Sequence, residues 1–287
     1  MPWSTDRLQH LAAGALTRTL HQSAGSRRLV QTQAPGGRPS HNERAASGTF
    51  VVMRATVATW NAWWANAKTS RGRRVAEVVV GLGADVVVLT EAEADVLPPD
   101  GFVVDAGVDW GYRTGREGRR KVLMWSAQPW SDFDAFGSAD LPGGRWVAAT
   151  TSTPIGPVRV VGVCVPWSGA HVTTGRRDRR PWQDHSSYLD GLGSLLTTQP
   201  RPLVVTGDFN QRIPRSRQPR RVADALDRAF SDLLIATAGE TDHGFLIDHV
   251  AHSGDLHAER TTVLSKTDLM GRLSDHTGAM VTFTRSS

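Results

Sequence analysis

Side chains suited to phosphate chemistry follow several apolar runs in this 287-residue chain. A run that ends abruptly in a carboxylate or carboxamide is typical of a buried strand whose last residue reaches the edge of a sheet. Three segments end such runs, TWN, VVVLTE and TGDFN, while IDHV lies within a further predicted strand and SDH precedes the last one. Their polar residues are Asn61, Glu91, Asp208, Asn210, Asp248, Asp275 and His276.

Gathered at one rim, these side chains would supply several carboxylates, two carboxamides and an imidazole. Hard divalent cations prefer oxygen ligands, and Mg²⁺ commonly uses one or two carboxylates while keeping several waters. The metal neutralises phosphate charge and lowers the pKa of bound water, and an imidazole can stabilise or protonate the phosphoryl oxygens. The set therefore points to metal-assisted hydrolysis of a phosphate ester.

Each segment also has a plainer interpretation. A glutamate after a strand is often a solvated loop residue, and Gly-Asp-x-Asn suits an Asx turn because these residues favour turns. Asp-His pairs arise by chance in a chain with ten histidines. The order of the segments and their position at strand ends make the combination more specific than any one part.

The elements that must position these residues follow from apolar periodicity. Strands are predicted over 51–60, 85–90, 121–125, 146–151, 158–165, 202–206, 245–250 and 279–284. Helices are predicted over 70–82, 182–197 and 223–236. Early alternation of strands and helices, with hairpin-like strands in the middle and at the end, predicts two packed sheets flanked by helices.

Residues 1–50 differ from the rest because they are rich in Arg, Gln, Ser, Gly and Pro and poor in acids. We expect a flexible N-terminal extension there, with a possible short amphipathic helix over 8–20, and a catalytic domain over 51–287. The extension could be a targeting peptide. It could also be dispensable, or precede a true start at Met53.

Overall composition limits the possibilities further. The single cysteine excludes an intrachain disulfide and a cysteine-rich zinc site, and it favours a reducing compartment, so we expect a cytoplasmic protein. The sequence contains no run of about 18 apolar residues, so it predicts no transmembrane segment. We expect a monomer. A net charge of +5 suits a polyanionic partner but is weak evidence alone.

The ordered segments resemble the endonuclease/exonuclease/phosphatase superfamily, which has the deoxyribonuclease-I-like fold. The resemblance covers roughly residues 54–284, and its most specific pieces are GDFN and the terminal SDH. It implies a four-layer α/β sandwich of two packed, mainly antiparallel sheets flanked by helices. It also implies cleavage of phosphate esters that depends on Mg²⁺ or Mn²⁺.

The resemblance further implies a metal site built from three residues. Glu91 matches the principal metal-ligating carboxylate and Asp275 a second carboxylate of the metal site. Asn61 matches the asparagine that supports the metal and the phosphate.

Four other residues match catalytic positions. Asp208 matches the aspartate that activates or positions the attacking water, and Asn210 the asparagine that holds the phosphate and that aspartate in register. Asp248 matches the carboxylate that orients the catalytic histidine, and His276 matches that histidine. A carboxylate partner would fix its tautomer and raise its pKa, which keeps it cationic near an anionic transition state.

One position departs from the family pattern. Members often carry a His or Tyr on the strand before the central helix, where it donates to the phosphate or leaving group. Here that strand contains Cys164, and a buried thiol is a poor donor. Either the following loop supplies the contact, through His171, Arg176 or Arg177, or water protonates the leaving group.

The substrate stays open between two classes. Arginine-rich segments at 116–121, 176–180 and 212–221 favour DNA or RNA, since cationic loops bind phosphate backbones. A narrow pocket walled by Trp63, Trp64 and Trp167 would favour a small phosphomonoester, an inositol phosphate or a phospholipid headgroup. A third hypothesis is an inactive family member that serves as a binding module.

Overall fold

The computed structural model describes residues 52–112 and 117–286. The predicted N-terminal extension and the short helix predicted over 8–20 lie outside the described residues. Among the described residues, no helix has the length and apolar character needed to cross a bilayer.

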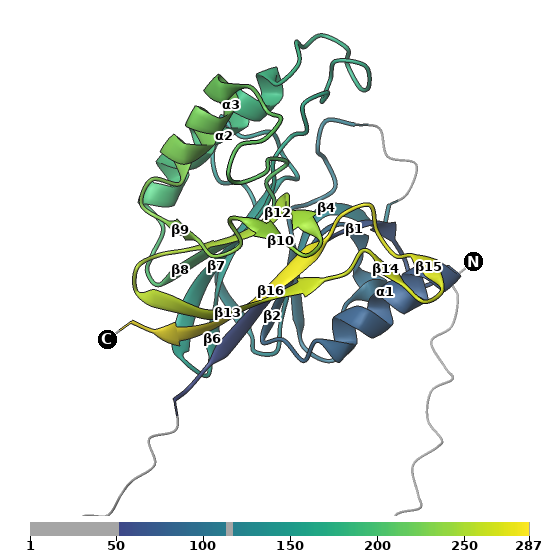
Figure 1. Cartoon of the computed structure of the whole chain (residues 1–287), viewed down its shortest axis with the longest axis vertical. Coiled ribbons are helices and arrows are strands. Elements are labelled where there is room, and N and C mark those ends of the chain that lie inside the picture. The colour runs from purple at the N-terminus through teal and green to yellow at the C-terminus, as the bar shows by residue number, and fades with distance from the viewer. Residues whose placement is uncertain (1–51, 113–116, 287) are drawn as a thin grey trace, which may run out of the picture. The chain divides into compact units, whose positions relative to one another are not determined.

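Two six-stranded sheets lie face to face (Figure 1). In spatial order, the first contains β13 (Leu256–Leu264), β16 (Gly278–Arg285), β1 (Ala55–Ala65), β2 (Val86–Glu93), β4 (Arg119–Ser126) and β3 (Phe102–Asp105). The second contains β5 (Trp130–Asp134), β6 (Trp146–Thr153), β7 (Gly156–Cys164), β8 (Leu203–Asp208), β12 (Asp248–His252) and β9 (Leu234–Ile235). Neighbouring strands are antiparallel except for β1–β2 and β7–β8, which are parallel.

Helices cover the outer faces of both sheets. They are α1 (Ser70–Gly81), α2 (Gln183–Thr197) and α3 (Arg220–Ala229), and a short 3₁₀ turn, η1 (Ala94–Val96), follows β2. Two small hairpins complete the described elements: β10 (Glu240–Thr241) with β11 (Gly244–Phe245), and β14 (Thr267–Asp268) with β15 (Gly271–Arg272).

Helix α1 covers the first sheet. Its start is capped by Thr69, whose hydroxyl accepts a hydrogen bond from the Gly72 N–H at 3.0 Å. Val75 and Val79 lie four residues apart, so they share one face of the helix. Both are buried in a cluster with Trp60 of β1 and with residues of β2.

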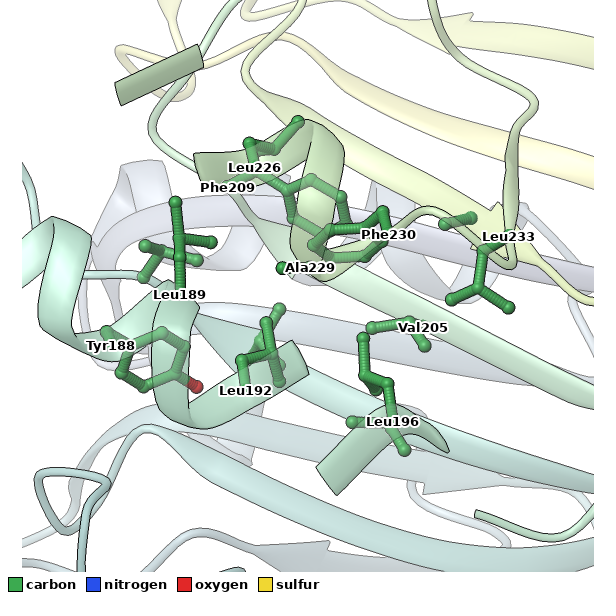
Figure 2. Packing of buried hydrophobic residues seen from close by; sticks show 14 of the residues in the cluster. Tyr188, Leu189, Leu192, Leu196, Val205, Phe209, Leu226, Ala229, Phe230 and Leu233 are labelled. Carbon is green, nitrogen blue, oxygen red and sulfur yellow. The ribbon is translucent and has the colours of Figure 1, made fainter. Parts of the chain in front are cut away.

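Helices α2 and α3 cover the second sheet from the opposite side (Figure 1). Figure 2 shows their apolar side chains packed together over the sheet. The labelled residues are Tyr188, Leu189, Leu192, Leu196, Val205, Phe209, Leu226, Ala229, Phe230 and Leu233.

A further apolar cluster fills the space between the two sheets, with Val57, Val88 and Val122 from the first and Val160 and Val204 from the second. The layers are therefore α1, the first sheet, the second sheet, and α2 with α3. This confirms the predicted four-layer α/β sandwich of two mainly antiparallel sheets.

One predicted helix boundary is wrong. Helical spacing predicted a helix over 223–236, but α3 ends at Ala229. The chain then turns, with the Leu233 N–H donating to the Phe230 carbonyl at 2.9 Å, and Ile235 pairs with Ala251 of β12. Strand pairing along an available sheet edge thus overrides the local helical pattern. The long edge strand β13 was not predicted because its centre is polar and exposed.

The close approach of β7 and β8 depends on Gly207, which directly precedes Asp208. Its φ is +139°, and a Cβ added there would lie 2.0 Å from the Val163 carbonyl oxygen. A side chain at this position is therefore excluded both by backbone conformation and by space.

We predict that Gly207→Ala lowers the free energy of unfolding by about 3 kcal/mol, because it combines backbone strain with a clash. Urea unfolding followed by circular dichroism measures this. Gly239→Ala is a matched control, since its φ is +106° but nothing lies within 4 Å of the added Cβ, and it should cost only about 1 kcal/mol. Equal losses in the two variants would contradict the argument.

Candidate active site

Asn61 joins the two sheets at one rim. It lies near the end of the regular β1–β2 pairing, before a shift in register. Its backbone N–H donates to Asp248 Oδ2 at 2.6 Å, and its side-chain Nδ2 donates to Asp208 Oδ2 at 3.1 Å. Asp208 and Asp248 are direct partners across the β8–β12 pair of the second sheet. One asparagine thus fixes two carboxylates that the opposite sheet presents.

Asp208 is held equally firmly by Asn210. The Asn210 N–H donates to Asp208 Oδ1 at 2.8 Å, and Asn210 Nδ2 donates to Asp208 Oδ2 at 3.0 Å and to the Val165 carbonyl at 2.8 Å. Asn210 has a φ of +52°, in the left-handed region that asparagine tolerates better than most residues. The Asx turn considered from the sequence is therefore present, and it orients the Asp208 carboxylate.

His276 is bonded to Asp248 through Nδ1 and Oδ1 at 2.8 Å. Its loop is pinned to β1, because Ser274 Oγ donates to the Asn61 carbonyl at 2.6 Å and accepts from the His276 N–H at 3.1 Å. The indole N–H of Trp60 donates to the His276 carbonyl at 3.0 Å. These bonds fix both the backbone and the ring of His276.

The two remaining carboxylates lie outside this hydrogen-bonded network. Glu91 has a φ of +52° at the irregular end of β2, and its Oε1 lies 2.5 Å from Lys121 Nζ. Asp275 is exposed, and its Oδ1 has a long contact of 3.4 Å with Ser274 Oγ. The structure thus brings five of the seven sequence-predicted residues into one network and leaves Glu91 and Asp275 beside it.

Buried charge sets the protonation of the network. Burial would lower the pKa of His276, but the negative charges of Asp248, Asp208 and Asp275 outweigh it and raise this pKa to about 10. Burial raises the pKa of Asp208, opposed by the charge of His276 and assisted by those of Asp248 and Glu91. The site therefore holds a cationic imidazole and an excess of negative charge that burial penalises.

This charge balance fits a divalent cation. The ligand atoms of Asp208, Asp248 and His276 lie within 4.8 Å of one another. His276 Nδ1 and Asp248 Oδ1 are already bonded to each other at 2.8 Å, so these three residues also form an acid–imidazole network. Carboxylate oxygens with excess negative charge, as at this rim, are the ligands that Mg²⁺ or Mn²⁺ prefers.

Residues 58–276 match the model of the endonuclease/exonuclease/phosphatase family. The chain belongs to this family. Its members are hydrolases of phosphate esters, and the fold agrees with that assignment. No curated protein sequence matches the chain.

Solved structures of the family share the fold at low sequence identity. An AP endonuclease from Archaeoglobus fulgidus is 17% identical, with a TM-score of 0.58 over 79% of this chain and 98% of that one. An endonuclease/exonuclease/phosphatase from Bacteroides vulgatus is 16% identical, with a TM-score of 0.58 over 81% and 99%. A 3′ phosphatase from Neisseria, bound to a product DNA hairpin, is 19% identical, with a TM-score of 0.57 over 79% and 98%.

Cys164 is the residue for which the sequence analysis expected a His or Tyr. It is fully buried opposite Asp208 in the β7–β8 register, and burial raises the pKa of its thiol to about 12. The thiol therefore stays neutral. A neutral buried thiol is a weak hydrogen-bond donor.

The loop after β7 does not offer His171 as a replacement. Its Nδ1 lies 2.7 Å from Asp184 Oδ2 and its Nε2 lies 3.2 Å from the Gly111 carbonyl. The ring also stacks on Tyr112 at 4.5 Å. Both ring nitrogens are thus engaged. Arg176 makes a long contact with Asp178 at 3.4 Å.

Lys121 is the residue of this region that sequence reasoning missed. It ends the basic REGRRK segment and begins the strand predicted over 121–125, but it was given no place in the site; it lies in β4 and is only 9% exposed. The pairs Thr90–Val122 and Ala92–Arg120 put Lys121 opposite Glu91. Only the antiparallel register of β2 and β4 reveals this, and that register could not be derived from composition.

The His276–Asp248 pair predicts a pH-dependent contribution to stability. A histidine whose pKa rises from 6.5 to about 10 on folding contributes its full stabilisation of the folded state below pH 6.5. This contribution is lost as the pH rises toward 10. We therefore expect the difference in melting temperature between wild type and His276→Gln to be largest near pH 6 and to shrink toward pH 10.

Thermal unfolding across this pH range measures the effect. His257→Gln is the control, because His257 is exposed on the edge strand β13. A difference between wild type and His276→Gln that stays constant with pH would contradict the assignment of charge.

Proposed function

We propose that this protein is a divalent-metal-dependent phosphodiesterase that acts on nucleic acid. The observation that carries the proposal is the buried Asp248–His276 pair beside the Asp208 and Asn210 side chains, because it puts a fixed cation next to an oriented carboxylate. Hydrolysis of a phosphate diester needs both: one group to position water and one to stabilise charge on the phosphoryl oxygens.

In this proposal Glu91 and Asp275 hold the metal, with Asn61 supporting it. Asn61 Oδ1 already accepts the Trp63 N–H at 2.9 Å and keeps one lone pair for a further contact. When bound, the metal supplies Lewis-acid neutralisation of phosphate charge and a lowered pKa for coordinated water.

The protein groups perform the remaining tasks. Asp208, held by Asn61 and Asn210, accepts a hydrogen bond from the attacking water and orients it. Asn210 Nδ2 stands between Asp208 and the Val165 carbonyl, where it keeps the carboxylate in register. Asp248 fixes the proton on Nδ1 of His276, so Nε2 donates to a phosphoryl oxygen.

A cationic hollow beside His276 supports a polyanionic substrate. Its volume is about 360 Å³, and Asp275 and His276 form part of its wall. The cations Arg212, Arg217 and Lys266 line it as well. None of the three has a carboxylate within 4.0 Å among the described residues.

The loop that carries these arginines is well ordered by hydrogen bonds. Gln218 is buried, and its Nε2 donates to the Arg212 carbonyl at 2.6 Å while its Oε1 accepts from the Arg217 N–H at 3.3 Å. The backbone at both arginines is thus fixed beside the hollow that His276 lines, and their guanidinium groups suit phosphates that flank a scissile one.

The tryptophans favour the same substrate class. Trp63 and Trp167 are 38% and 44% exposed, so they present their rings to solvent. An exposed indole can stack on a nucleic acid base, whereas a closed pocket for a small phosphomonoester needs buried walls. A small phosphorylated molecule or phospholipid headgroup remains the alternative substrate class.

We predict that Glu91→Gln and His276→Gln each lower kcat by about 10³-fold, because the first weakens the hold on the metal and the second removes a cation that stabilises the reacting phosphate. The assay measures hydrolysis of plasmid DNA, RNA and bis(4-nitrophenyl) phosphate with Mg²⁺ or Mn²⁺. Circular dichroism checks folding. Full activity in both variants would show that the site lies elsewhere, and a folded wild type without activity on any substrate would refute the function.

We also predict that replacing both Arg212 and Arg217 by Ala weakens DNA binding and reduces the slope of log affinity against log salt by about 2, roughly one for each lost phosphate contact. Fluorescence anisotropy over a salt series measures this slope. The control is Arg260→Ala, an exposed arginine of β13 outside the hollow. A wild-type slope near zero would instead favour a small substrate.

A further inference from the structure

Lys121 is a buried cation next to Glu91 and has no part in the proposed mechanism. Its side chain is 11% exposed, and its Nζ lies 2.5 Å from Glu91 Oε1. A buried ammonium is costly unless a carboxylate neutralises it. Glu91 does so here, although Glu91 is also the proposed metal ligand. A divalent cation and the Lys121 ammonium therefore compete for one carboxylate.

The surroundings hold Lys121 in place. Its Nζ lies 5.0 Å from the centroid of the Trp64 ring, and the Arg119 guanidinium lies 4.8 Å from the same ring. Trp64 in turn stacks on Trp110 at 5.6 Å. The aromatic ring gives the ammonium a second favourable contact that does not depend on Glu91.

Strand β4, which carries Lys121, approaches β7 of the opposite sheet closely. Gly162 makes this possible, because a Cβ added there would lie 2.7 Å from Val122 Cγ1. Val122 follows Lys121 in the chain, and Gly162 lies two residues before Cys164. Strand β4 therefore packs closely against β7 two residues before Cys164.

Electrostatics agree with this proximity. Burial dominates the raised pKa of the Cys164 thiol, and among the nearby charges that oppose it, Lys121 acts more strongly than Arg145. Arg145 Nη1 lies only 3.7 Å from Cys164 Sγ. The charge of the Lys121 ammonium therefore acts on the thiol.

We propose that Lys121 is a catalytic residue that donates to the scissile phosphate in place of the missing strand donor at position 164, and that Glu91 holds it until a divalent cation takes over that carboxylate. This inference rests on the proposed metal-dependent function. Lys121 acts as a fixed cation with hydrogen-bond donors, so no proton needs to leave it. The donor comes from β4 of the first sheet and not from β7 of the second.

The first test is metal binding without substrate, measured by isothermal titration of the full-length protein with Mn²⁺. We expect Lys121→Met to bind Mn²⁺ about tenfold more tightly than wild type, because a competing cation next to Glu91 is removed. Arg119→Met is the matched control. It removes the other cation from the same indole ring but has no contact with Glu91, so its Mn²⁺ affinity should stay within about twofold of wild type. Equal or weaker Mn²⁺ binding by Lys121→Met would overturn the inference.

The second test is turnover of bis(4-nitrophenyl) phosphate at saturating Mn²⁺. Lys121→Met should lower kcat by about 10²-fold with little change in KM, since a donor to developing charge acts mainly in the transition state. Lys121→Arg should restore part of kcat. Should Lys121→Met be unstable in thermal unfolding, Lys121→Gln also removes the charge and should behave alike. A wild-type kcat in the charge-removed variants would overturn the donor role.

The two tests also separate this inference from the proposed function. A wild-type protein that hydrolyses no phosphate ester would refute the function and the donor role together. An active wild type whose Mn²⁺ affinity is indifferent to Lys121 would overturn the inference about Lys121 alone.

Discussion

The arrangement of the site depends on the buried carboxylate of Asp248. It is completely shielded from solvent, and its two oxygens have separate partners: the Asn61 N–H from the opposite sheet and the His276 ring. An unpaired buried carboxylate costs several kcal/mol, so both partners are needed for the rim to form. The same two bonds join the sheets and fix the imidazole. Folding of the rim and protonation of His276 are therefore coupled.

The sequence predicted much of this rim because its residues end apolar runs. The run before Glu91 and the run before Asp208 are both continuous, and continuous apolar runs predict strands covered on both faces. Their last residues must then reach an edge, which the structure confirms for Asp208 at the end of β8, whereas Asn61 lies within β1 and Asp248 begins β12. The chemical roles of these residues came from the family resemblance and not from periodicity.

Other features could not be predicted, because they depend on which strands are neighbours. The contact between Lys121 and Glu91 requires the register of β2 with β4, and the basic composition of REGRRK indicated only contact with nucleic acid or with solvent. Helix α3 ends at Ala229 because the chain then turns and Ile235 pairs with Ala251 at the edge of β12. The loss of His171 as a candidate donor depends on Asp184, thirteen residues further along the chain. In each case a tertiary partner outweighs the local pattern.

The charges around the site explain how a family fold can tolerate a cysteine at position 164. Glu91, Asp208 and Asp248 bring more negative charge to the rim than His276 alone can balance, and the pKa of Asp208 is raised chiefly by burial and further by the charges of Asp248 and Glu91. A second cation is therefore favourable at this rim even before any substrate is considered. Gly162 leaves room for β4 to approach, and Lys121 brings that cation from the opposite sheet. A cation supplied in this way must be neutralised while the site is empty of metal, and the nearest carboxylate is Glu91. Competition between lysine and metal is thus the physical consequence of moving the donor from one sheet to the other.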